Sequence, residues 1–237
     1  MEDKVFLKPA AKGGFRFNKE VADVFDNMVT RSVPMYPEMT RLSARFAAKA
    51  AIDNTSIYDL GCSTCTTLLE VNKHLNGKQV QLIGCDPSAD MLQKAKEKTS
   101  ELSNIELQQS SAQDTCLQNA SVVIMNFTLQ FINQTERPAI LKKIADALPK
   151  GGVFVFSEKI KTDLPGDLDN LVLDLYDEYK ILNGYADSEI ANKRKALENV
   201  LIPDSHAHHR EALLQAGFAG SAIVASWLNF SCMIAWK

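Results

Sequence analysis

The stretch Ser56-Ile-Tyr-Asp-Leu-Gly-Cys-Ser63 decides the fold of this 237-residue chain. Its β-favouring start predicts a buried strand that ends near Asp59, closed by the glycine at position 61. A glycine directly after a strand lets the backbone approach a ligand closely, and the helix that should follow offers free N–H groups at its start. A full glycine triplet is missing, because Cys65 stands where a third glycine would fall. The strand–loop–helix context therefore carries more weight than the motif alone.

Helices and strands alternate after this stretch. The hydrophobic pattern predicts helices at 64–74, 88–99 and 134–148, and strands at 80–85, 105–108, 120–126 and 153–157. Such alternation is typical of an α/β fold with a doubly wound, mostly parallel sheet and right-handed crossovers.

Further elements flank this core. Two helices are expected within 18–51, and 163–200 is a charged, mostly helical insertion with tyrosines that should pack on the sheet or on a second subunit. A helix at 206–216 precedes strands at 222–227 and 230–236, whose tight connection predicts an antiparallel hairpin at one edge of the sheet. We expect one domain that spans 1–237.

Composition and charge exclude several classes of protein. With 46% hydrophobic and 23% charged residues, the chain is neither disordered nor a disulfide scaffold. It has 26 basic and 29 acidic residues, and this net charge of -3 argues against a chain built mainly to bind nucleic acid. No apolar run approaches the roughly 20 residues of a membrane span. An N-terminus without an apolar signal region predicts a cytoplasmic protein, in which the five cysteines are free thiols.

Polar residues follow the predicted strands where ligands bind in such sheets. Asp86 ends the second strand, 20–30 residues after the glycine loop, where a carboxylate can accept both hydroxyls of a ribose. The alternative is that Asp86 only caps the helix that begins at Pro87. Asn126 ends the apolar fourth strand, either as a ligand contact or as a satisfied polar strand end. No phosphate-binding motif is present, so a nucleoside without pyrophosphate fits best. Together these strand ends indicate a Rossmann-like seven-stranded fold that binds S-adenosylmethionine (SAM).

Six stretches carry a more specific resemblance, which covers about 17–237. They are Arg31-Ser-Val-Pro-Met-Tyr36, Tyr58-Asp-Leu-Gly-Cys-Ser63, Asn126-Phe-Thr-Leu-Gln-Phe131, Ser157-Glu-Lys159, Asn183-Gly-Tyr185 and Lys193-Arg-Lys-Ala-Leu-Glu-Asn-Val200. In this order and spacing the chain resembles the carboxy-S-adenosyl-L-methionine synthase family. The resemblance implies that prephenate and SAM become phenylpyruvate and carboxy-SAM, the donor used by another enzyme to modify a tRNA wobble uridine. It also implies a homodimer that needs no direct contact with nucleic acid.

The resemblance further implies the residues of the site. Those that line the SAM-derived moiety are Tyr36, Gly61, Cys62, Ser63, Asp86, Pro87 and Asn126. Adenine recognition falls to Ser111 and Ala112, which replace an acidic residue of the family, unless the loop shifts and Asp114 serves. Arg194 would pair with the carboxylate of the product and act in catalysis, since a guanidinium offers a planar fork to a carboxylate. Without the resemblance, Arg194 would be interpreted as a solvated charge.

Alternative functions remain at this stage. A conventional small-molecule methyltransferase and a non-catalytic SAM-binding subunit both fit the general fold. A metal site is not expected, because Cys62 and Cys65 form one isolated pair and zinc commonly takes four ligands from two such pairs. The cluster His206-Ala-His208-His209 is interpreted as a solvated first turn of a helix.

Overall fold

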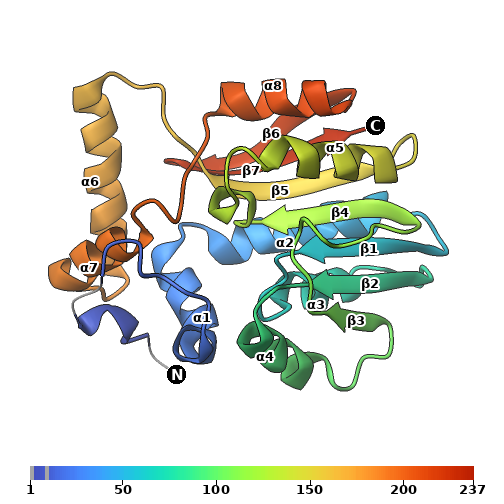
Figure 1. Cartoon of the computed structure of the whole chain (residues 1–237), viewed down its shortest axis with the longest axis horizontal. Coiled ribbons are helices and arrows are strands. Elements are labelled where there is room, and N and C mark those ends of the chain that lie inside the picture. The colour runs from blue at the N-terminus through green and yellow to red at the C-terminus, as the bar shows by residue number, and fades with distance from the viewer. Residues whose placement is uncertain (1–2, 9–10) are drawn as a thin grey trace.

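The computed structural model describes residues 3–8 and 11–237 and is built around one mixed sheet (Figure 1). The strands follow the spatial order β3-β2-β1-β4-β5-β7-β6. The first five pair in parallel, and β7 is antiparallel to both β5 and β6. Their bounds are β1 Thr55–Leu60, β2 Val80–Cys85, β3 Ile105–Gln108, β4 Ala120–Asn126, β5 Val153–Lys159, β6 Gly220–Trp227 and β7 Phe230–Trp236. The predicted seven-stranded α/β fold and its terminal hairpin are confirmed.

Helices cover both faces of the sheet. Their bounds are η1 Val5–Leu7, α1 Lys19–Ser32, α2 Tyr36–Ala50, α3 Thr66–Asn72, α4 Ala89–Thr99, η2 Leu129–Phe131, α5 Arg137–Ala147, α6 Gly166–Leu182, α7 Asp187–Leu197 and α8 His206–Ala216. Apolar side chains of α5 and α8 pack with one set of sheet residues, and those of α2 and α3 pack with another. Strand β4 is apolar along nearly its whole length because it is buried between these two layers.

The inserted helices stand beyond the carboxyl ends of the parallel strands, beside α1 (Figure 1). Two tyrosines of α6 pack on the terminal hairpin: the Tyr176 ring lies 5.1 Å from Phe230, and that of Tyr179 lies 5.2 Å from Trp227. The expected packing of the insertion onto the sheet is therefore observed for these two side chains.

Arg31 of α1 fixes the turn between α6 and α7. Its Nε donates to the carbonyl of Asn183 at 2.8 Å and its Nη2 to that of Gly184 at 2.7 Å. The guanidinium also lies 4.3 Å from the centre of the Tyr185 ring. Two of the stretches that carry the sequence resemblance thus meet in space, and their contact places the insertion over the strand ends.

The N-terminal segment runs along α7 on its way to α1. The amide of Gly13 donates to the carbonyl of Lys195, and the amide of Phe15 donates to that of Ala196. At Asn18 the side chain accepts from the amide of Val21 and caps α1, so the helix begins where the pattern predicts it. Among the described residues, no helix is both long and apolar enough to cross a membrane.

Several boundaries differ from the sequence prediction, among them the start of α5 and the end of β5. Helix α5 begins at Arg137 instead of 134, with Pro138 in its first turn, where a missing N–H costs no hydrogen bond. Strand β5 continues two residues beyond Ser157, through Glu158 and Lys159. This extension has a physical cause, because the buried Glu158 carboxylate accepts from the amides of Leu129 and Gln130.

Candidate functional site

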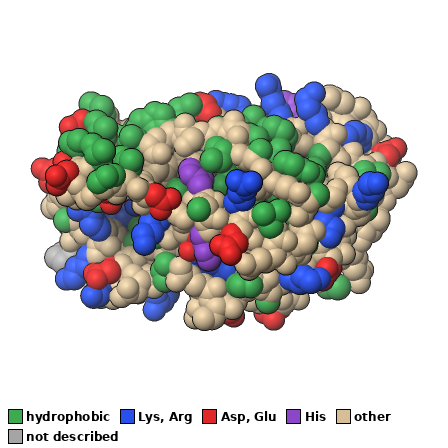
Figure 2. Space-filling model, turned by 90° about the horizontal axis from the view of Figure 1, so that it is seen from above, with side chains coloured by type: hydrophobic (Ala, Val, Ile, Leu, Met, Phe, Trp, Pro, Cys, Tyr) green, Lys and Arg blue, Asp and Glu red, His purple; other side chains and the backbone are tan. Residues whose placement is uncertain are grey.

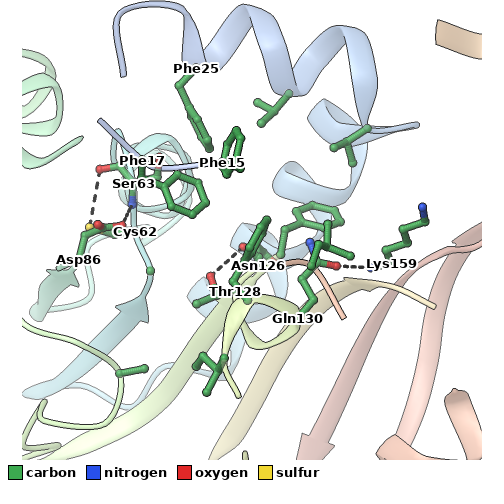
Figure 3. Close-up of a pocket in the computed structure, with 18 of the residues that line it drawn as sticks. Phe15, Phe17, Phe25, Cys62, Ser63, Asp86, Asn126, Thr128, Gln130 and Lys159 are labelled. Atoms are coloured by element: carbon green, nitrogen blue, oxygen red, sulfur yellow. Dashed lines mark hydrogen bonds between the residues drawn. The ribbon is translucent and has the colours of Figure 1, made fainter. Parts of the chain in front are cut away.

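A cavity of about 460 Å³ opens at the carboxyl ends of β1, β2 and β4 (Figure 3). Nine of the ten residues proposed from the sequence line it: Tyr36, Gly61, Cys62, Ser63, Asp86, Pro87, Ser111, Ala112 and Asn126. They come from separate stretches of the chain, and the parallel topology brings them together.

The glycine loop after β1 requires its glycine. Gly61 has φ +81°, and a Cβ atom there would overlap the hydroxyl and methyl groups of Thr128. The next turn carries Ser63, whose amide donates to Oδ2 of Asp86 at 2.9 Å. The loop is therefore fixed both by close packing and by the carboxylate at the end of the neighbouring strand.

Asp86 faces the cavity with a carboxylate held in place by the backbone. Its Oδ1 accepts from the amide of Ser88 at 2.8 Å, and burial raises its pKa in spite of the hydrogen bonds from Ser88 and Ser63. The N-cap of α4 is Ser88, whose hydroxyl accepts from the amide of Met91. Capping of the helix is thus the task of Ser88, and Asp86 lines the cavity.

Asp59, at the end of β1, is a further carboxylate of the site. It is 2% exposed and lines the cavity, and its Oδ2 has no hydrogen-bond partner in the described part of the chain. Burial, with the charge of Asp86, raises its pKa to about 8. A buried acceptor without a donor is costly, so a cationic or N–H-bearing ligand group would stabilise it. The sequence analysis used Asp59 to mark the strand end and did not select it as a site residue.

Asn126 and Tyr36 border the middle of the cavity. The Oδ1 of Asn126 accepts from the hydroxyl of Ser43 at 3.1 Å, and its backbone carbonyl accepts from that of Thr128. Asn126 is thus both a satisfied strand end and a cavity-lining residue. The Tyr36 ring lies 5.8 Å from that of Phe127, and burial raises its pKa, so the phenol remains protonated.

An aromatic wall, formed by Phe15, Phe17, Phe25 and Phe131, lines the cavity, and Figure 3 shows the first three of these side chains on the side away from the strands. The Phe17 ring lies 5.0 Å from Phe15 and 5.2 Å from Phe131, both edge to face. Phe15 and Phe17 precede the first long helix, and no local pattern links them to the strand ends. Their role is visible only in the folded chain.

The loop after β3 settles the position of two predicted residues. Ser111 and Ala112 line the cavity, whereas Asp114 does not belong to its lining. The Asp114 carboxylate accepts from the Ser111 hydroxyl at 2.6 Å, and the Asp114 amide donates to the same hydroxyl oxygen. The loop therefore turns the Asp114 carboxylate toward Ser111.

Arg194 is the predicted residue that this chain does not bring into the cavity. Its exposed guanidinium pairs with Asp177 of α6, and the side chain lines an adjoining cavity. Successive residues of a helix point about 100° apart, so Lys193 lines the main cavity instead. Lys159 and Lys193 line both cavities, and the sequence analysis named neither as a site residue.

The cysteines near the site are buried, free thiols. Burial raises the pKa of Cys65 to about 12 and that of Cys85 to about 11, so both are protonated at neutral pH. In the described ranges, no three His, Cys, Asp or Glu side chains come together in a way that could hold a metal ion.

Comparison with known proteins agrees with this geometry. A family model described as a methyltransferase domain matches residues 57–152. An O-methyltransferase family protein from Burkholderia thailandensis superposes with a TM-score of 0.65 at 17% identity, over 97% of this chain and 64% of that one. Human N-acetylserotonin methyltransferase in complex with SAM gives a TM-score of 0.61 at 16% identity, over 92% and 55%. The chain thus spans less than two thirds of these solved structures, and the likeness shows the fold.

Sequence relatives match over their whole length. The carboxy-S-adenosyl-L-methionine synthase of Sulfurimonas denitrificans is 42% identical over 238 residues, 100% of both chains, and that of Campylobacter fetus subsp. fetus is 41% identical over 239 residues, again 100% of both. At such identity over the full length, the chain belongs to the carboxy-S-adenosyl-L-methionine synthase family.

Proposed function

We propose that this protein transfers a carboxylate from prephenate to the methyl carbon of SAM, with carboxy-SAM and phenylpyruvate as products. The observation that carries the proposal is full-length similarity to carboxy-SAM synthases, combined with a cavity lined by nine residues predicted for a SAM-derived ligand. In the net reaction the ring C–carboxylate and C–hydroxyl bonds of prephenate break, one methyl C–H bond of SAM breaks and one C–C bond forms. Water carries away the hydroxyl group and the methyl proton.

The residues at the acidic end of the cavity fit the cationic, nucleoside-bearing substrate. In the proposed complex, Asp86 accepts from the ribose hydroxyls and Asp59 from the α-ammonium group of SAM. The aromatic wall packs on the adenine, whose edge meets Ser111 and Ala112. Supporting this assignment, Oδ2 of the cavity-lining Asp59 is a buried acceptor that has no hydrogen-bond donor among the described residues.

The product supplies a carboxylated donor for modification of the tRNA wobble uridine by a separate enzyme. Such a division of labour agrees with the net charge of -3, because a protein that makes only the donor needs no basic surface for RNA. The proposal includes a cytoplasmic location, no membrane association and no metal.

Mass spectrometry tests the proposal directly. Purified protein is incubated with SAM and prephenate and then denatured, and the released ligand is weighed. We expect an ion heavier than SAM by one carbon dioxide, formed in step with phenylpyruvate. Methylated product with S-adenosylhomocysteine would instead indicate a conventional small-molecule methyltransferase. Binding of SAM without any turnover would indicate a non-catalytic subunit.

Arg194 is proposed to bind the carboxylate of the product. The cavity that it lines adjoins the main one through shared residues, including Tyr176 and Lys193. We expect Arg194→Ala to weaken carboxy-SAM binding about tenfold or more, the cost of a charge-assisted hydrogen bond, and to leave SAM binding nearly unchanged. Calorimetric titration with both ligands measures the difference, with the exposed Arg210→Ala as control. Equal losses for both ligands would remove this role from Arg194.

Homodimer formation is proposed through α6. Three of its leucines, Leu168, Leu171 and Leu175, are about half exposed at helical spacing, and Figure 2 shows hydrophobic side chains gathered at the end of the molecule where α6 lies. Such an unpartnered apolar stripe fits a self-complementary contact. We expect Leu171→Glu to yield monomers in sedimentation velocity, whereas Leu214→Glu on α8, at similar exposure, leaves the dimer intact. The opposite pattern would place the contact elsewhere.

A further inference from the structure

Two lysines enter the cavity at the end opposite Asp59 and Asp86. Lys159 is the last residue of β5, and Lys193 lies on α7. Lys193 Nζ donates to the Ser32 hydroxyl at 2.7 Å and lies 5.3 Å from the centre of the Phe6 ring, while Lys159 Nζ lies 4.9 Å from that of Tyr176. Neither ammonium group forms a salt bridge with any carboxylate in the part of the chain that the structure describes.

The surroundings disfavour both charges. Burial lowers the pKa of Lys193 to about 7 and that of Lys159 to about 8. Lys180 lowers both values further, Arg31 adds to the effect at Lys193, and Arg194 adds to it at Lys159. Asp3 acts in the opposite direction on Lys193, as do Asp177 and Asp169 on Lys159. Both side chains are half-buried, and a lysine withdrawn from water normally has an acidic partner, so these two leave room for an anion from outside the chain.

The topology separates these lysines from the SAM-binding carboxylates. Asp59 and Asp86 end β1 and β2, on one side of β4, whereas Lys159 ends β5 on the other. Asn126, the end of β4, pairs in register with Ser157, two residues before Lys159. The cavity therefore runs from an acidic end across β4 to a basic end (Figure 3). A sulfonium would be repelled by the basic end and attracted by the acidic one.

We propose that Lys159 and Lys193 form the subsite for the carboxylate co-substrate, each lysine binding one carboxylate of a small organic dianion beside the methyl carbon of SAM. This assignment rests on the proposed function, since it deepens the recognition of the second substrate in the same cavity. Carboxylate is also present in the amino-acid part of SAM, so the test must separate these two sources.

Three variants form the core of the test. Lys159→Gln and Lys193→Gln each remove one positive charge from the cavity, and Lys161→Gln removes an exposed one two residues beyond β5, outside the lining of both cavities. Affinity for SAM is measured by calorimetry, and the KM for prephenate by the appearance of phenylpyruvate. We expect each cavity variant to raise the KM about tenfold or more and to keep SAM affinity within about twofold, with no change for Lys161→Gln.

Folding supplies an independent readout. Removing a half-buried charge that lacks an acidic partner should leave the melting temperature unchanged or raise it, whereas loss of a lysine with a structural role would lower it. A loss of SAM affinity equal to the rise in KM would show that the lysines bind the carboxylate of SAM. An unchanged KM in both variants would place the co-substrate elsewhere. Either result overturns the proposal.

A binding experiment tests the anion subsite independently of the proposed reaction. Phenylpyruvate is titrated into SAM-loaded wild-type protein and into the variants, with no turnover required. We expect wild-type affinity to fall as pH rises from 7 to 9, because lysines with pKa values of about 7 and 8 lose their protons there. The pH dependence should vanish in the Lys159→Gln/Lys193→Gln double variant. If wild-type protein makes no carboxy-SAM but shows this binding, the proposed reaction fails while the anion subsite stands.

Discussion

Replacement of Gly61 by alanine should nearly abolish SAM binding. The residue has φ +81°, which costs an alanine about 1–2 kcal/mol, and its new methyl group would overlap Thr128 at the end of β4. Overpacking of this kind adds about 1–3 kcal/mol, and relief requires that the loop move away from the ligand. Together these costs correspond to a loss of SAM affinity of about 100-fold, measurable by calorimetry.

A second glycine offers a matched control. Gly151 has φ +82°, but a Cβ atom there meets nothing within 4 Å, and the residue lies outside the cavity lining. Gly151→Ala carries the same backbone strain without the overlap, so it should lower stability modestly and leave SAM affinity unchanged. If both variants lost affinity alike, general destabilisation would explain the result and the close approach at Gly61 would not matter.

The largest effect on stability is expected at Arg137, one of the most buried charges of the fold. Its side chain is 4% exposed and pairs with Asp204, which is 8% exposed. It also donates to the carbonyls of Ile132 and Ile202, and so joins the loop after β4 to the segment before α8. Arg137→Ala takes the guanidinium away from the buried Asp204 carboxylate, which keeps only the hydrogen bond from Gln134 and the neighbouring His208 among the described side chains, and this loss costs about 3–5 kcal/mol. At about 2–4 °C per kcal/mol, the melting temperature should fall by about 6–20 °C.

An exposed pair on the same helix provides the comparison. Lys142 and Asp146 form an i,i+4 salt bridge with side chains 59% and 58% exposed. Because water screens such a pair, Lys142→Ala should cost no more than about 0.5 kcal/mol. Calorimetric melting of both variants measures the contrast, and similar shifts would mean that the Arg137–Asp204 pair is no more stabilising than a surface contact.

Most of the fold was predictable because its signals are local. Strand β4 is a continuous apolar run, and Asn18 and Ser88 mark helix starts that depend on one side-chain hydrogen bond each. The end of β5 was not predictable in the same way. Glu158 and Lys159 are charged residues that a local pattern assigns to a loop, and they stay in the strand because Glu158 binds two amides of η2.

The site likewise contains residues that the sequence predicts and residues that it does not. Residues at strand ends, such as Asp86 and Asn126, follow from sequence order, because parallel topology brings those ends together. Sequence order does not tell which of the adjacent Lys193 and Arg194 faces the cavity. The rotation of α7 decides between Lys193 and Arg194, and this rotation depends on distant contacts such as the hydrogen bond from the Asn192 side chain to the carbonyl of Phe6.

The N-terminal segment contacts both the nucleoside end of the cavity and the helix that carries Lys193 at its basic end. Phe15 supplies part of the wall at the nucleoside end, while the amides of Gly13 and Phe15 hold the last turn of α7, the helix of Lys193. A displacement that took the Phe15 ring out of the cavity would also strain the hydrogen bonds from the amides of Gly13 and Phe15 to α7. The nucleoside end and the basic end of the cavity are therefore joined by one short segment, through the side chain of Phe15 on one side and its backbone amide on the other.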